Sequence, residues 1–162
     1  PGWMGSKNSK VKYLNNGCST KRREVEAMEL KSAKFEVRRS QVPNAGMGLF
    51  ARRELPRGTK LKYRGQLMTS QQVEEKYPGD VLAPYTLSFK RFGHVFFVDA
   101  SETPQHLARY ANDSHGTLFI PNAVFRDPDP GRLWPCLYLT RSVKPGEEIF
   151  ADYGRVFWSE SN

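Results

Sequence analysis

Short apolar runs separated by glycine and proline turns extend through most of the chain, and this pattern limits the fold more than any other feature. Apolar and polar residues alternate over 85–89 and 94–98, on either side of the turn 91–93, which predicts a hairpin. Further strands are expected around residues 35–37, 49–50, 61–67, 122–125, 133–139 and 148–151.

The helical stretches are short. They are expected at residues 22–30, in a helix capped by Ser70 and ended near Tyr77, and in a turn at 106–110. A doubly wound nucleotide-binding fold needs longer helices between its strands. The pattern therefore predicts a mostly β domain with short helices.

The composition narrows the class of protein. A chain of 162 residues with 38% hydrophobic residues suits one globular domain. No apolar run approaches the roughly 20 residues of a membrane-spanning helix, so no membrane partner is expected. Cys18 and Cys136 are too few for a disulfide scaffold or a structural zinc site, and the histidines lack ligand spacing. No metal site is predicted, and Cys136 is expected to be a buried core thiol.

The formal net charge of +8 is unevenly distributed, because lysine and arginine crowd the first forty residues. We interpret residues 1–33 as a basic N-terminal extension, loosely ordered and partly derived from an expression tag. This arm is either a solvated segment or a contact for DNA, and Lys21-Arg22-Arg23 is a weak signal for nuclear targeting. The domain itself is expected over 34–158, followed by a tail at 159–162.

Three segments carry residues suited to a binding site. The first contains Gly46-Met47-Gly48-Leu49-Phe50-Ala51 and continues to Leu55-Pro56-Arg57-Gly58, and the second is Arg109-Tyr110-Ala111-Asn112-Asp113-Ser114-His115 with Pro121-Asn122 after it. The third is Pro145-Gly146-Glu147-Glu148-Ile149-Phe150-Ala151-Asp152-Tyr153-Gly154. Taken singly, they are a glycine turn that lets a ligand approach the backbone, a polar turn, and a turn and strand ending in a tyrosine.

Together, the order and spacing of these segments resemble the SET-domain family of protein-lysine methyltransferases, over about residues 35–158. The resemblance implies a fold of several small sheets with a C-terminal pseudoknot, in which the chain end passes under the loop of the asparagine motif. The sequence departs from the family in two places. Asp113 stands where histidine is usual, and the interval from Ser114 to Pro121 is longer than the family norm.

The resemblance also implies S-adenosylmethionine as the cofactor and assigns site residues. Those expected to bind the cofactor are Gly46, Met47, Gly48, Tyr110, Asn112, Asp113 and Trp158. Tyr153 is expected to be the catalytic tyrosine, and Tyr85 a second catalytic tyrosine in the substrate channel, beside Phe150 and Ala151. Tyr85 is equally well explained as a half-buried strand residue, and Trp158 as a core anchor.

The function implied is an S-adenosylmethionine-dependent protein-lysine N-methyltransferase. The expected partner is a histone tail or nucleosome in the nucleus, which would be the host nucleus for a viral or bacterial protein, with possible DNA contact through the arm. Two alternatives stay open. The first is a catalytically weak or inactive SET-like domain that serves as a peptide or nucleic-acid binding module, and the second is a methyltransferase for a non-histone protein.

Overall fold

The structure is a computed structural model that describes residues 32–79 and 85–153. The predictions for the basic extension therefore lie outside the described residues except at 32–33. The predicted helix at 22–30, Cys18, Trp158 and the tail at 159–162 also lie outside them.

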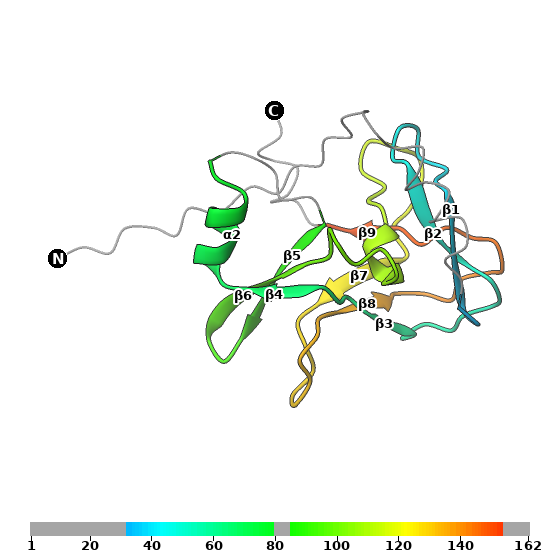
Figure 1. Cartoon of the computed structure of the whole chain (residues 1–162). Coiled ribbons are helices and arrows are strands. Elements are labelled where there is room, and N and C mark those ends of the chain that lie inside the picture. Colours follow the sequence, from blue (N-terminus) through cyan, green and yellow to red (C-terminus); the bar gives the residue numbers. More distant parts are fainter. Residues whose placement is uncertain (1–31, 80–84, 154–162) are drawn as a thin grey trace.

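The described part of the chain forms three small sheets (Figure 1). The first pairs β1 (Phe35–Arg39) with β2 (Met47–Ala51). The second has the order β3 (Lys60–Lys62), β8 (Cys136–Leu139), β7 (Ala123–Arg126) and β9 (Ala151–Asp152). The third has the order β4 (Gln66–Met68), β6 (His94–Asp99) and β5 (Thr86–Arg91). The prediction of a mostly β domain with several small sheets is confirmed.

The two helical elements within the described residues are short, as expected. They are α2 (Ser70–Lys76), beside the third sheet, and the 3₁₀ helix η1 (Leu107–Tyr110). The sequence placed the helix cap at Ser70, but the structure places it at Thr69, whose hydroxyl accepts a hydrogen bond from Gln72 N while Gln72 Oε1 accepts one from Thr69 N. This reciprocal pair needs a glutamine or glutamate three residues after the cap, and the spacing from Thr69 satisfies it.

One continuous core lies under the first two sheets and extends to the third. The strands β2 and β8 are buried at nearly every position, so both of their faces are covered, and Cys136 is a buried free thiol, as predicted. Burial raises the pKa of that thiol. The largest fully buried apolar side chains are Leu49, Phe50, Leu55, Val98, Leu137, Val143 and Ile149.

The strand predicted across 61–67 is wrong, because the chain breaks at Gly65 and its two halves join different sheets. A Cβ atom at Gly65 would lie 2.1 Å from the carbonyl oxygen of Asp99. The backbones of these two residues can approach so closely only because Gly65 has no side chain. The partner is far away in sequence, so no local pattern marked the break.

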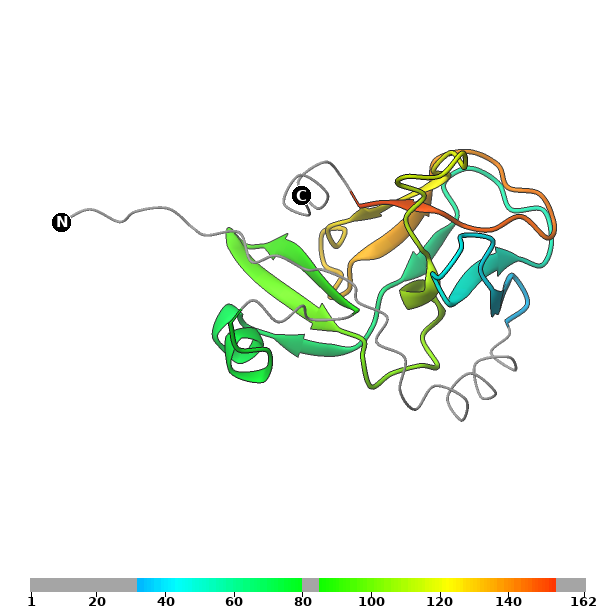
Figure 2. The same cartoon turned by 90° about the horizontal axis from the view of Figure 1, so that it is seen from above.

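The last strand lies later than predicted, and its position creates the chain crossing that the family resemblance implied. Ala151 N donates to Asn112 O at 2.8 Å on one edge, and Ala123 N donates to Phe150 O at 2.9 Å on the other. Residues 113–121 connect Asn112 to the start of β7, so this loop passes over the chain at 150–151. In Figure 2 this part of the chain is the red end of the coloured ribbon, which runs beside β7. This arrangement agrees with the expected pseudoknot.

We expect Gly65→Ala to lower the free energy of unfolding by about 3 kcal/mol, because the added methyl group must displace backbone. Gly58→Ala is the matched control. Gly58, unlike Gly65, has a left-handed conformation, at φ +83°, and no atom lies within 4 Å of its Cβ position, so its substitution should cost only the backbone strain of about 1 kcal/mol. Urea denaturation measures both, and equal losses would contradict the assigned close contact.

Candidate active site

The three motif segments meet at Asn112. Its side-chain amide donates to Met47 O at 3.0 Å, and its backbone carbonyl accepts from Ala151 N. Asn112 therefore joins the glycine turn before β2 to the final segment of the described chain. The residue is only half-buried, so its position is set by these bonds rather than by packing alone.

A fully buried carboxylate, Glu148, lies next to this junction. It is 1% exposed and accepts hydrogen bonds from Ser40 Oγ at 2.6 Å and Gln41 N at 2.7 Å. Asn112 Nδ2 lies 3.4 Å from the same carboxylate. A Cβ at Gly48 would lie 2.1 Å from Glu148 Oε1, so the second glycine of the turn makes room for the carboxylate. The sequence suggested a ligand role for Gly48, but did not reveal this packing role.

Asp113 holds the segment that carries Tyr153. Its carboxylate accepts from Tyr153 N at 2.9 Å and from His115 N at 2.7 Å. The Tyr153 hydroxyl donates to Ala111 O at 2.7 Å. The sequence marked Asp113 as a departure from the family pattern and as an expected cofactor contact, not as a structural residue. The structure shows that its side chain fixes both the long loop and the predicted catalytic tyrosine.

The side chain of Asn122 bonds the crossing segment on its other edge, just before β7. Its side-chain oxygen accepts from Phe150 N at 2.9 Å, and its amide donates to Glu148 O at 2.8 Å. The residue is 1% exposed. An asparagine side chain can offer both a donor and an acceptor, so here it pairs with backbone that forms no regular strand.

A cavity of about 280 Å³ opens beside Tyr153, between β5 and β7. Its wall is partly aromatic: the rings of Tyr63 and Phe125 pack edge to face at 5.4 Å, and Phe125 lies 6.1 Å from the ring of Tyr153. Polar and charged side chains complete the lining. The residues around the cavity are Tyr63, Thr86, Leu87, Ser88, Phe89, Arg109, Phe125, Arg126, Asp127, Pro135, Asp152 and Tyr153.

The other predicted site residues lie at different depths. Tyr85 immediately precedes the cavity residue Thr86, and Tyr110 is 8% exposed, with its pKa raised by burial. Ala151 is fully buried in the core, and Phe150 stacks on Phe119 of the long loop at 4.9 Å. Neither lines the cavity, so their roles in a substrate channel stay predictions.

The sequence did not single out Arg109 or Glu148, although both lie inside the quoted motifs. Arg109 lines the cavity, and its guanidinium carbon lies 3.8 Å from the centre of the Tyr85 ring. The sequence signal for both residues is charge alone, because Arg109 stands among apolar residues and Glu148 follows another glutamate. A charged side chain also fits a solvated surface residue, so the sequence alone did not assign either residue to the site.

The residues at the junction fit S-adenosylmethionine, which is a sulfonium cation. Gly46 has φ +74°, and no atom lies within 4 Å of its Cβ position, so the turn leaves open space against the backbone. The carbonyl oxygens of Met47 and Ala111 and the hydroxyl of Tyr153 bring partial negative charge to the meeting point of the three segments. Such oxygen atoms favour a cation.

Over 32–79 and 85–153, no group of three or more histidine, cysteine, aspartate or glutamate side chains is arranged to hold a metal ion. Within the same ranges, no helix has both the length and the apolar character needed to cross a membrane.

Comparison with known proteins agrees with this geometry. The SET domain family model matches residues 46–154. Among solved structures, the methyltransferase domain of human PR domain-containing protein 2 superposes with a TM-score of 0.60 at 16% identity, covering 92% of this chain and 95% of that one. CpSET8 from Cryptosporidium gives a TM-score of 0.58 at 23% identity, covering 74% of this chain and 57% of that one. A comparison with curated protein sequences finds no match.

The fold and the meeting of the three motifs define a SET domain, and the chain belongs to the SET-domain family. Members of this family are protein-lysine methyltransferases that take the methyl group from S-adenosylmethionine. The chain spans little more than half of the CpSET8 chain that it resembles.

The ion pair between Lys76 and Asp99, close to Tyr85, gives a pH-dependent prediction. Burial alone would raise the pKa of Asp99, but hydrogen bonds from Lys76, Ser101 and Tyr77 outweigh it and hold that pKa below its usual range. Ionised Asp99 therefore stabilises the fold above the unfolded-state pKa of about 3.9. That stabilisation is lost as the pH falls toward the lower pKa of the folded state.

We expect the free energy of unfolding of the wild-type chain to fall, relative to that of Asp99→Asn, as the pH drops below about 4. Urea denaturation over a series of pH values measures the difference. Lys76→Met should weaken this pH dependence, because it removes a hydrogen-bond donor to the carboxylate. An unchanged dependence in Lys76→Met would contradict the assigned pairing.

Proposed function

We propose that this chain is an S-adenosylmethionine-dependent protein-lysine N-methyltransferase. The observation that supports the proposal most strongly is the junction at Asn112, which joins Met47 of the glycine turn to the segment ending in Tyr153. A cavity with aromatic walls opens beside that tyrosine. Methyl transfer to a lysine side chain requires that the site of the methyl donor and the channel for the lysine meet. In this proposal they meet at Tyr153.

In this proposal Gly46, Met47, Asn112 and Tyr110 hold the cofactor, largely through backbone groups and the asparagine amide. When bound, the cofactor supplies an electrophilic methyl group on sulfur. The chain itself contributes alignment, because a displacement at carbon needs the nucleophile, carbon and leaving group in line. Trp158 and Asp113 were expected to help bind the cofactor, and those roles stay proposals.

The target lysine must present a neutral amine, whereas its usual pKa is about 10.4. A partly apolar cavity lined by Tyr63, Phe125 and Tyr153 disfavours the ammonium form. The Tyr153 hydroxyl directs its proton at Ala111 O. Its oxygen can therefore accept a hydrogen bond from the incoming amine and orient the nitrogen lone pair toward the methyl carbon.

Tyr153→Phe tests this role. We expect methyl transfer to fall about 100-fold while cofactor affinity changes little, because the variant keeps the ring and loses only the orienting oxygen. Transfer of labelled methyl groups to protein measures the rate, and calorimetry measures cofactor binding.

Tyr138→Phe is the matched control for Tyr153→Phe. Its hydroxyl bonds Asp129 at 3.0 Å, and the residue does not line the cavity, so activity should be retained. If wild-type protein methylates no protein substrate although it binds the cofactor, the enzyme proposal fails and a binding module takes its place.

The substrate that fits best is a basic peptide such as a histone tail, and nuclear action follows from that choice. Asp127 and Asp152 line the cavity and would attract basic residues beside the target lysine. The net charge of +8 and the basic extension suit an additional contact with nucleosomal DNA. A non-histone protein with a similar basic stretch satisfies the same chemistry, so the substrate itself must be tested.

Replacing Lys21, Arg22 and Arg23 together by glutamine tests the DNA contact. We expect lower activity on nucleosomes and a weaker salt dependence, by up to about one unit of slope for each phosphate that the arm no longer neutralises, with activity on free histone tails unchanged. Mass spectrometry of methylated products measures both substrates.

The control for this triple variant removes the same charge from Arg52, Arg53 and Arg57, which are exposed in the folded domain. An equal loss in this control would assign the effect to net charge. Equal activity of wild-type protein on tails and nucleosomes would remove the arm from the proposal.

A further inference from the structure

Three unfavourable features lie together where β5 begins, at the cavity wall and immediately beside it. Tyr85 has a left-handed backbone at φ 61°, which non-glycine residues rarely adopt. Thr86 Oγ1 and Arg109 Nε are buried, with no hydrogen-bond partner among the described residues. Each feature lowers stability, and such strain persists where the surroundings dictate it, commonly at functional sites.

The surroundings of Tyr85 dictate its position closely. Its carbonyl accepts from the Tyr63 hydroxyl at 2.6 Å and from Ala100 N at 3.0 Å. The guanidinium carbon of Arg109 lies 3.8 Å from the centre of its ring. The backbone is thus fixed by two hydrogen bonds and the ring by a stacked cation.

Arg109 is itself fixed by the backbone that follows β6. Its Nη1 donates to the carbonyl oxygens of Ala100 and Ser101. These two hydrogen bonds occupy one end of the guanidinium plane and leave its face against Tyr85. A lysine could keep the charge and one such bond, but has no flat face to stack.

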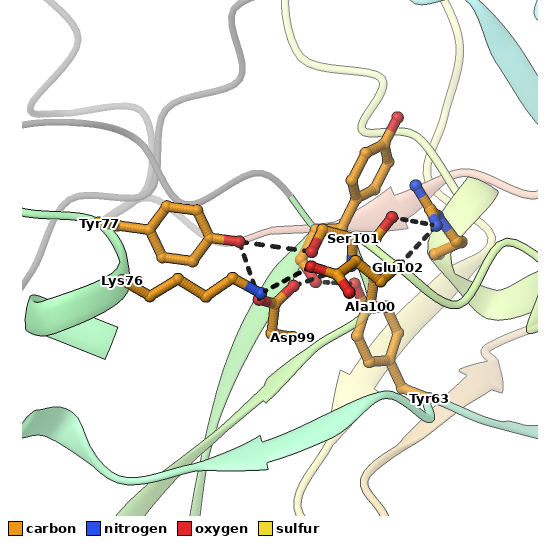
Figure 3. A network of polar contacts seen from close by, with 9 residues as sticks. Tyr63, Lys76, Tyr77, Asp99, Ala100, Ser101 and Glu102 are labelled. Atoms are coloured by element: carbon orange, nitrogen blue, oxygen red, sulfur yellow. Dashed lines mark hydrogen bonds and ion pairs between the residues drawn. The ribbon is translucent and has the colours of Figure 1, made fainter. Parts of the chain in front are cut away.

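Asp99 anchors that backbone segment to α2. Its carboxylate, 1% exposed, accepts from Lys76 Nζ, Tyr77 OH and Ser101 N, each at 2.8 Å (Figure 3). Figure 3 shows Lys76 and Tyr77 reaching Asp99 from the helix while Ala100 and Ser101 lie on its other side. The polar network therefore runs from α2 through Asp99 to Arg109.

We propose that Arg109, which lines the cavity, is a positioning residue that fixes the ring of Tyr85 beside the wall of the proposed target-lysine channel. This inference rests on the proposed methyltransferase function. Arg109 acts through Tyr85, so it should affect how the protein substrate is aligned and leave cofactor binding unchanged. The ion pair of Lys76 with the buried Asp99 holds the backbone of Ala100 and Ser101, to which Arg109 donates.

The first test compares Arg109→Met with Arg38→Met. Arg38 makes the same two kinds of contact at another place in the domain. Its guanidinium carbon lies 3.8 Å from the centre of the Phe50 ring, and its Nη2 donates a hydrogen bond to the backbone oxygen of Gly146 at 2.7 Å. We expect Arg109→Met to lower kcat/KM for the protein substrate about tenfold, with cofactor affinity unchanged and no rescue by Arg109→Lys. Arg38→Met should keep wild-type kinetics, and an equal fall in both variants would overturn the proposal.

A double-mutant cycle separates positioning from direct contact with substrate, because Arg109 also lines the cavity. In a Tyr85→Ala background, Arg109→Met should change kcat/KM less than twofold, since the ring that it orients is gone. If the two losses multiply, Arg109 acts independently of Tyr85 and the proposal is wrong.

A readout without catalysis keeps this inference distinct from the proposed function. In protein with ¹³C-labelled tyrosine rings, the Tyr85 signal, assigned with Tyr85→Phe, should shift or broaden in Arg109→Met and stay in place in Arg38→Met. An unmoved signal in Arg109→Met overturns the positioning role. Absence of methyl transfer in wild-type protein would overturn the function but leave this ring measurement intact.

Discussion

The site depends on the way the chain at 150–151 is bonded on both of its edges. Asn112 accepts from Ala151 on one edge, and Ala123 donates to Phe150 on the other. Because residues 113–121 connect these edges, the last segment cannot leave without breaking both sets of bonds. That constraint brings Tyr153 next to Ala111 and places the cavity beside it.

Four polar side chains make this irregular crossing possible. A buried backbone group without a partner is destabilising, and here regular strand pairing is too short to supply every partner. These side chains satisfy backbone groups at Gln41, at Met47 and along 148–153, and they belong to Asn112, Asp113, Asn122 and Glu148. The motif residues therefore build the crossing as well as the proposed binding site, and a substitution at any of them affects folding and function together.

Local sequence pattern predicted the elements whose determinants are local. The hairpin of β5 and β6 turns at the expected residues, since alternation and Gly93 mark it. The break at Gly65 and the bond from Tyr153 N to Asp113 were not predicted, because each depends on a partner distant in sequence. The stacked pair of Arg109 and Tyr85 escaped notice for the same reason. The three motifs were recognisable only through their family resemblance, and nothing in their periodicity indicated that they meet.

The distance in sequence between the bonded partners has a consequence for biosynthesis. Ser40 and Glu148 are 108 positions apart, and Asp113 and Tyr153 are 40 apart. During translation, the glycine turn and the asparagine loop emerge from the ribosome well before the segment that must pass between them. Contacts of such long range slow folding, and residues 148–153 can form them only while the loop at 113–121 still leaves room for them to enter.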